Sequence, residues 1–217
     1  MFRIHHVTYL FLLAPILGCS SSNTTSNAGA SCSSTAPCGG TLEGTWRINS
    51  VCVEGDLASA MNAQMGLPAA CDNTFQSATL SGAGTVTFAN SAETDNLTQS
   101  IDANLVFTAA CESAVAKQTV TLTASTRSTI QQTLTASGGF TTANCSLSNG
   151  SCMCTASREQ QAPTAPQPYT VSGNTITYSG TDASSPTDYC VSGTLLTARQ
   201  PLSGISGVTV VSVLQKQ

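Results

Sequence analysis

Two stretches near the C-terminus, YTVSGNTIT (residues 169–177) and YCVSGTLLT (residues 189–197), decide the fold. They share the form Y-x-V-S-G-x-x-[IL]-T. In each copy the Tyr and the Val lie on one face of an extended strand, and the Gly supplies the positive φ of a tight turn before a second strand. The repeat therefore predicts two β-hairpins in series, which is an antiparallel meander.

Short runs rich in Thr and Val extend this pattern toward the N-terminus. In IDANLVFTA (residues 101–109) the odd-numbered residues are apolar, whereas Asp102 and Asn104 are polar, so one face of this strand is apolar. The C-terminal run VTVVSVL is apolar throughout and indicates a strand covered on both faces. The predicted strands upstream and downstream of the repeat cover residues 44–53, 84–89, 101–109, 117–124, 129–136 and 208–214.

One segment predicts a helix. Asp56 precedes LASAMNAQMG and can cap its first turn, and Gly66 ends it. Leu57, Met61 and Met65 form one apolar stripe at helical spacing. Such a stripe is typical of core contact; the alternative is a pliable lid over a cavity, a role that suits Met.

A chain of short antiparallel strands needs closure into a barrel, or two packed sheets, to cover its edges. The 217 residues are 41% hydrophobic and only 8% charged, which suits one core and excludes a helical, Lys/Glu-covered protein. The sequence therefore predicts an all-β domain over residues 41–217. A closed barrel is the expected architecture, and a β-sandwich is the rival.

Gly44-Thr45-Trp46 opens the first predicted strand. Together with the two hairpins, this resembles the lipocalin-like β-barrels of bacterial lipoproteins, over residues 43–54 and 169–199. The resemblance implies a meander barrel whose floor is closed by Trp46, with Arg199 packed across it. It also implies that the short helix after the first strand lies in the loop that overhangs the barrel mouth.

The N-terminus predicts export. Residues 7–17 (VTYLFLLAPIL) follow Arg3 and form an apolar run too short to span a bilayer, as in a signal peptide over residues 1–18. The run ends in Ile-Leu-Gly before Cys19, which resembles the lipobox of bacterial lipoproteins. The resemblance implies lipidation of Cys19 and a membrane anchor made of acyl chains. An ordinary secretory signal is the alternative.

Two further features place the chain in the cell envelope. Ser20 follows the lipidated Cys where an Asp would favour inner-membrane retention, so we expect the outer membrane, on its periplasmic or its surface face. Residues 20–40 carry no charged residue and little apolar surface, which predicts that the segment from Cys19 to residue 40 is a flexible Ser/Thr-rich tether.

Nine cysteines remain after Cys19, and in an exported chain they indicate disulfides, with one Cys left over. We expect Cys111 to be unpaired. The Cys152-Met153-Cys154 motif lies among strand-forming residues rather than at a helix start, which argues against a redox centre. The expected pairs are Cys32 with Cys38, Cys52 with Cys71, Cys145 with Cys152, and Cys154 with Cys190.

The chain lacks the usual catalytic residues. Both histidines, His5 and His6, lie in the signal peptide, so no triad, Cys-His dyad or His-based metal site is available. Zinc would need four thiolates at paired spacings that these cysteines do not supply. The eleven Asp and Glu residues include Glu93 and Asp95, and most of the eleven fall at strand ends or turns, as solvated or capping carboxylates do. We expect no enzyme activity, metal, cofactor or nucleic-acid partner.

Two functions follow from these expectations. The first is a lipid-anchored envelope protein that binds or presents a small lipophilic ligand inside the barrel. The alternative is a structural or adhesive surface lipoprotein with a fully packed core and no ligand, whose protein partners the sequence does not name. An enclosed apolar cavity of roughly 300 Å³ or more would favour the first.

Overall fold

A computed structural model describes residues 35–179 and 185–217. The predicted signal peptide, Cys19 and the tether up to residue 34, Cys32 included, lie outside the described residues. Within them the chain forms ten strands, three α-helices and one short 3-10 helix. These are β1 (Gly44–Glu54), α1 (Leu57–Gln64), η1 (Ala69–Cys71), β2 (Phe75–Ala89), β3 (Ala92–Thr108), α2 (Ala109–Ala116), α3 (Ala124–Ala136), β4 (Thr142–Ser148), β5 (Ser151–Gln161), β6 (Gln167–Ser172), β7 (Thr175–Tyr178), β8 (Thr187–Ser192), β9 (Leu195–Pro201) and β10 (Thr209–Lys216).

Eight of these strands are hydrogen-bonded in a ring. The order runs β2-β1-β10-β9-β8-β7-β6-β3, and a further pairing of β3 with β2 returns it to its start. All of these pairings are antiparallel. Apart from the β4–β5 segment, each ring strand pairs with its neighbours in the chain. The all-β, antiparallel class is therefore as predicted, and β4 and β5 account for the strands beyond eight.

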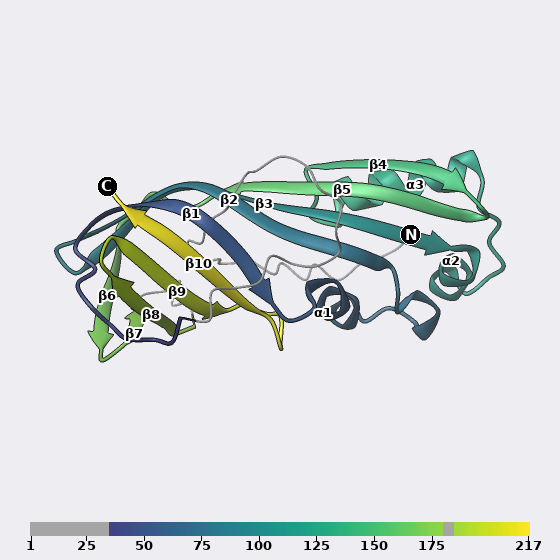
Figure 1. Ribbon diagram of the computed structural model, residues 1–217. Coiled ribbons are helices and arrows are strands. Elements are labelled where there is room, and N and C mark those ends of the chain that lie inside the picture. Colours follow the sequence, from purple (N-terminus) through teal and green to yellow (C-terminus); the bar gives the residue numbers. More distant parts are fainter. Residues whose placement is uncertain (1–34, 180–184) are drawn as a thin grey trace.

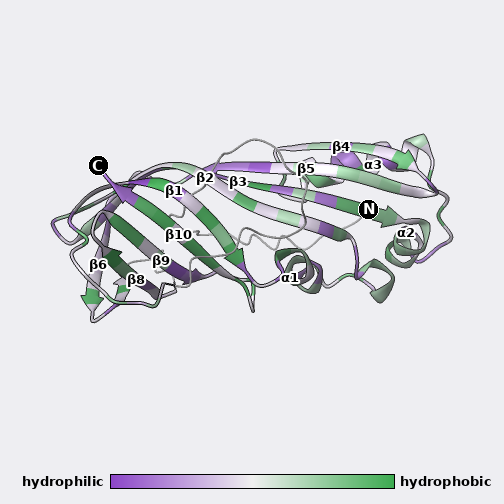
Figure 2. Ribbon diagram, viewed as in Figure 1, coloured by the Kyte–Doolittle hydropathy of each residue, from purple (hydrophilic) through white to green (hydrophobic). Residues whose placement is uncertain are grey.

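The two repeated hairpins form as predicted. Val171 pairs with Ile176 across β6–β7, and Val191 pairs with Leu196 across β8–β9. The turn glycines Gly173 and Gly193 have φ of +62° and +61°, a conformation that other residues rarely adopt. The apolar C-terminal run forms β10, which lies between β1 and β9 and is coloured largely as hydrophobic in Figure 2.

A second, elongated part of the fold extends from the ring (Figure 1). Residues Gly44 to Arg47 of β1 pair with β2 only as far back as Thr85, and beyond that point β2 pairs with β3 alone. Strand β2 leaves β1 at Gly84, where β3 comes very close. A Cβ at this position would lie 2.0 Å from the Asn96 carbonyl oxygen, so no larger residue fits. The far part of β3 pairs with β5, and β5 pairs with β4, so a four-stranded sheet continues out of the ring.

Each part has its own hydrophobic core. The ring encloses a cluster that includes Trp46, Leu97 and Leu214. The extension packs a second cluster, which includes Phe107 and Cys152, against Ile130 of α3. The sequence predicts one core, whereas the structure has two, joined by the long β2–β3 ribbon.

Two predicted strands are wrong. Residues 117–124 contain no strand and lead into α3, and residues 129–136 are helical. Thr123 and Thr126 form a capping box at the start of α3, and Ile130 and Leu134, four residues apart, are its buried positions. The Thr content of the segment resembles a strand, but its apolar spacing is that of a helix.

Helix α1 forms where it is predicted. The Asp56 carboxylate accepts hydrogen bonds from the Ser59 backbone N–H (3.0 Å) and from the Ser59 hydroxyl (2.6 Å). These two bonds lower the pKa of Asp56. Asp56 is exposed, so its contribution is that of an ordinary N-cap.

Replacing Asp56 with Ala is expected to lower the free energy of unfolding by about 1 kcal/mol, because the first turn of α1 loses its cap. Urea denaturation monitored by circular dichroism measures this loss. Asp56→Asn keeps a side-chain acceptor and is the matched control, which we expect to lose only a few tenths of a kcal/mol. Equal losses in both variants would contradict a role for the cap.

Candidate functional site

The start of β1 fixes one end of the ring interior. Trp46 is completely buried, and its indole N–H donates to the Leu42 carbonyl oxygen at 2.6 Å. Trp46 pairs with Lys216 of β10, and the Lys216 ammonium lies 5.1 Å from the centroid of the indole ring. A cation therefore sits over this Trp, as the lipocalin resemblance implies, but it is a Lys.

The expectation that Arg199 packs across Trp46 is wrong. Arg199 pairs with Val211 of β10, and Val211 pairs with Cys52 of β1, six residues beyond Trp46. At strand geometry this is roughly 20 Å away. Arg199 instead forms an ion pair with Glu54.

The middle of the ring contains a small cavity with a volume of about 20 Å³. This is room for about one water molecule. The hydroxyl oxygens of Thr187 and Ser212 line it and are buried, without a hydrogen-bond partner among the described residues. Its lining comes from six strands: Val86, Phe88, Glu93, Ile176, Tyr178, Thr187, Leu196, Ala198, Gln200, Ser212 and Leu214.

Two buried carboxyl groups lie beside this cavity. Glu93 and Asp95 alternate on the inward face of β3 and are 1% and 6% exposed. The Tyr178 hydroxyl donates to Glu93 Oε2, and the Glu93 carboxyl group is close enough to Asp95 to raise its pKa by charge repulsion.

The pKa of both carboxyls is raised. Burial is the main cause for each, and for Asp95 the neighbouring Glu93 charge raises the pKa further. No Lys, Arg or His is among the residues that line the cavity. The pair therefore holds at least one proton at neutral pH, and burial also raises the pKa of Tyr178, which stays a hydrogen-bond donor.

The pair is not arranged like the carboxylates of a glycosidase. Those stand about 5 Å or more apart, so that a glycosidic bond fits between them. Here both groups are buried, beside a cavity with space for about one water molecule. The chemistry that this arrangement can perform is proton sharing inside the fold.

The sequence does not predict this pair, because most of the acidic residues are expected at strand ends or turns as solvated or capping groups. The signal that could have found them is the period of two in residues 101–109. Extended back along the same strand, it points Glu93, Asp95 and Leu97 inward, as the burial along β3 shows.

Helix α1 does not cover the cavity. Leu57 is buried and Met61 is partly buried against both hydrophobic clusters, whereas Met65 is 41% exposed. None of the three lines the cavity. Leu57 and Met61 therefore pack at the junction of the two cores. This agrees with the prediction of core contact and not with that of a lid over the cavity.

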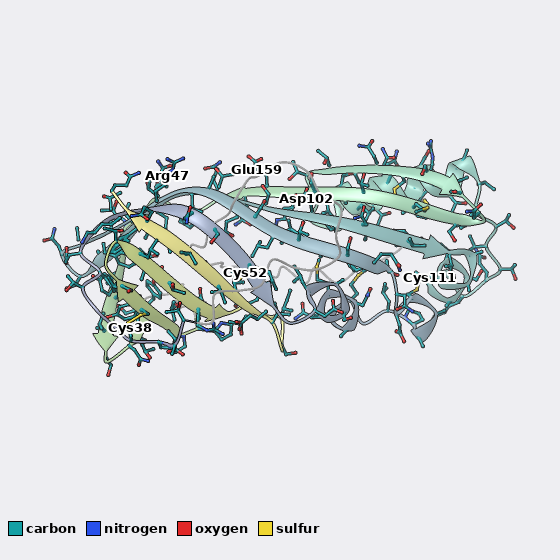
Figure 3. The ribbon with its side chains drawn as sticks, viewed as in Figure 1. Cys38, Arg47, Cys52, Asp102, Cys111 and Glu159 are labelled. Atoms are coloured by element: carbon teal, nitrogen blue, oxygen red, sulfur yellow. A yellow bond between two sulfur atoms is a disulfide. The ribbon has the colours of Figure 1, made fainter. Side chains whose placement is uncertain are left out.

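The disulfides differ from the predicted pairs. Cys38 bonds with Cys190, Cys71 with Cys111, and Cys145 with Cys154. Cys52, labelled in Figure 3, is disulfide-bonded as well. Cys152 is the free thiol in the described part of the chain, so the prediction that Cys111 is unpaired is wrong. The four predicted pairs Cys32–Cys38, Cys52–Cys71, Cys145–Cys152 and Cys154–Cys190 are all wrong.

Strand register explains the difference. Cys145 lies directly opposite Cys154 in the β4–β5 ladder, whereas Cys152 lies opposite Leu147. Cys38 lies beside β8 because its backbone N–H and that of Gly39 both donate to the Tyr189 carbonyl oxygen. Neither placement can be derived from the spacing of cysteines along the chain.

The chain matches no known family model, and a comparison with curated proteins finds no similar sequence. Among the described residues no helix is both long enough and apolar enough to cross a membrane. The interpretation of the site therefore depends on its own geometry.

Proposed function

We propose that the eight-stranded ring is a lipocalin-like β-barrel with an inserted β4–β5 arm. Three observations support this. The ring strands follow one another in chain order around the closure, the first strand opens with a G-x-W motif, and Trp46 of that motif is fully buried beneath a cation. The inserted segment leaves after β3 and returns at β6, so it does not disturb the meander.

We further propose that the protein is a non-enzymatic envelope lipoprotein, anchored through Cys19, with a structural or adhesive role and no apolar ligand. The observation that carries this is the small volume, about 20 Å³, of the cavity beside Glu93 in the described part of the ring. Sites for small molecules start at roughly 300 Å³. The side chains that line this cavity leave no room there for a lipophilic molecule, which favours a packed core over a carrier.

The arm offers a surface for contact with a partner. The outward residues of β3, β5 and β4 are mainly hydroxyl and amide side chains, with Asp102 and Glu159 as charged exceptions (Figure 3). Several are hydrogen-bonded to each other across strands, such as Thr142 with Ser157 at 2.7 Å. A broad polar face of low charge suits a neutral, hydroxyl-rich polymer of the envelope.

Native mass spectrometry tests the absence of a ligand. We expect the full chain, released from membranes in mild detergent, to show the mass of the acylated protein alone, before and after organic extraction of bound lipid. Cys19→Ser should remove the acyl mass and leave the protein in the soluble fraction. A lipophilic mass that leaves on extraction, in wild type and Cys19→Ser alike, would overturn the packed-core proposal.

Co-sedimentation with isolated envelope polysaccharide tests the surface. Thr155→Arg places a charge at the centre of the polar face and is expected to weaken binding at least fivefold. Thr133→Arg, at an exposed position of α3, is the matched control and should bind as wild type does. Equal binding by both variants would contradict the use of this face.

A further inference from the structure

Three sulfur atoms meet inside the arm. The Sγ atoms of Cys145, Cys152 and Cys154 all lie within 4.8 Å of one another. All three residues are buried, and the Cys152 thiol is 3.9 Å from the Cys154 sulfur. Strands β4 and β5 position these residues. Cys145 of β4 lies opposite Cys154 of β5, and Cys152 lies two residues before Cys154 on the same buried face of β5.

Helix α3 covers most of this cluster: Cys145 is 8% exposed and Cys152 is not exposed at all. Ile130 and Leu134 are buried in the same core, and the Gln131 amide oxygen accepts a hydrogen bond from the Cys145 backbone N–H at 3.1 Å. Arg127, one turn earlier on α3, has a buried Nε without a hydrogen-bond partner in residues 35–179 and 185–217. The sulfur cluster therefore has a dry environment with a cation nearby.

The charges around Cys152 support this placement of Arg127. Burial raises the pKa of the Cys152 thiol, the Glu112 carboxylate raises it further, and the Arg127 charge lowers it. Burial also raises the pKa of Glu112, which disfavours its negative charge. Arg127 is thus the group that can offset negative charge on the sulfurs.

We expect the β4–β5 hairpin to stay folded when the Cys145–Cys154 disulfide is reduced. It links residues only nine positions apart, inside a hairpin held by seven paired residues on each strand. Reduction leaves that ladder in place. The Cys38–Cys190 bond, by contrast, joins residues 152 positions apart.

We propose that, when a dithiol reductant opens the Cys145–Cys154 bond, the thiolates of Cys145, Cys152 and Cys154 bind one Cu(I) ion in a three-coordinate site. One reductant thiolate attacks a sulfur of the bond, the other protein sulfur leaves as a thiolate, and the second reductant thiol closes the reductant's own disulfide. Two electrons pass to the protein. Cu(I) then displaces the three thiol protons.

Geometry and ligand chemistry favour Cu(I). With metal–sulfur bonds of about 2.3 Å, three sulfurs in a trigonal plane lie about 4.0 Å apart. The Cys152–Cys154 pair already has a separation of 3.9 Å. Structural zinc needs four ligands, whereas the cluster found in the described residues offers three, and soft thiolates select Cu(I).

Competition for Cu(I) tests the site. The full chain is reduced with a dithiol, freed of it under anaerobic conditions, and titrated with Cu(I) against bathocuproine disulfonate. We expect reduced wild type to bind one Cu(I) at least tenfold more tightly than reduced Cys152→Ser, and the oxidised wild type not to compete. Equal affinity in the two reduced proteins would overturn the proposal.

Two further measurements exclude trivial explanations. Cys71→Ser/Cys111→Ser lacks the other thiols of this core, and it should bind Cu(I) as wild type does; loss of binding would place the ion elsewhere and overturn the assignment. X-ray absorption of the wild-type complex should show three sulfur neighbours. Two neighbours would overturn the proposal even if Cys152→Ser failed to fold.

Discussion

Raising the pH from about 4 to about 9 is expected to lower the free energy of unfolding of the wild-type protein by several kcal/mol, because of Glu93 and Asp95. Both carboxyls have a raised pKa in the folded state, to about 7 and about 9, and titrate near pH 4 when unfolded. Between these values the folded protein binds more protons than the unfolded chain. Stability is therefore fully present below pH 4 and is lost as the pH rises.

The double variant Glu93→Gln/Asp95→Asn should remove this slope, since neither amide ionises. The amide oxygen introduced by Glu93→Gln would still accept the hydrogen bond of the Tyr178 hydroxyl, so the variant should be more stable than wild type at pH 8. Urea denaturation at pH 5, 7 and 9 measures both effects. Asp102→Asn, an exposed position on the same strand, is the control and should keep the wild-type slope. A wild-type slope in the double variant would contradict the assignment.

The Glu93–Asp95 pair lies at a short ladder of the ring, so its ionisation is expected to weaken the contact between β3 and β6. Glu93 lies where β3 joins β6, and that seam consists of two residue pairs, Ala92 with Pro168 and Glu93 with Gln167. The Tyr178 hydroxyl reaches Glu93 from β7, across β6, and so reinforces the shortest ladder between β3 and the rest of the ring. Ionisation of the pair at high pH is expected to loosen this seam first, which hydrogen exchange of the β6 amides would detect as faster exchange.

Removal of the Cys38–Cys190 bond is expected to cost about 5 kcal/mol, the largest effect of any single crosslink among the described ones. The bond closes a loop with a separation of 152 residues, and the entropy of loop closure grows with that length. The Cys145–Cys154 bond, with a separation of nine residues, should contribute about half as much. Guanidinium denaturation of the two double Cys→Ser variants compares them.

The contacts around Cys38 give this comparison a second control. The Tyr189 hydroxyl donates to the Gly40 carbonyl oxygen at 2.9 Å, and the Val191 backbone N–H donates to the Gly39 carbonyl oxygen. Tyr189→Phe removes one of these bonds but keeps the disulfide, and it should cost about 1 kcal/mol. If the Cys38→Ser/Cys190→Ser variant lost no more than this, the segment would be held by its hydrogen bonds rather than by the crosslink.

Local signals account for what the sequence predicts correctly. Turn glycines and the Tyr-x-Val alternation specify the two hairpins, and Asp56 with its Ser59 contacts specifies α1. These features depend only on residues within a few positions of each other. The apolar alternation of residues 101–109 likewise needs no information about the rest of the chain.

The remainder depends on contacts between distant residues. Helix α3 is hidden by its Thr content, because only its burial against β4 distinguishes Ile130 and Leu134 as a helical pair. The Cys38–Cys190 bond and the Trp46–Lys216 contact both follow from the register around the ring. Asp95 and Glu93 become a buried pair only because β6 and β7 close over them.

The Cys38–Cys190 bond also determines how the fold bears a mechanical load. A pull on the chain from the N-terminal side of Cys38 passes through the sulfur bridge into β8, in the middle of the ring order, before it reaches β1. The strand nearest that end in sequence is thereby spared from being peeled away pair by pair. Force is distributed over the β7–β8–β9 ladders, so the ring would resist traction as one body.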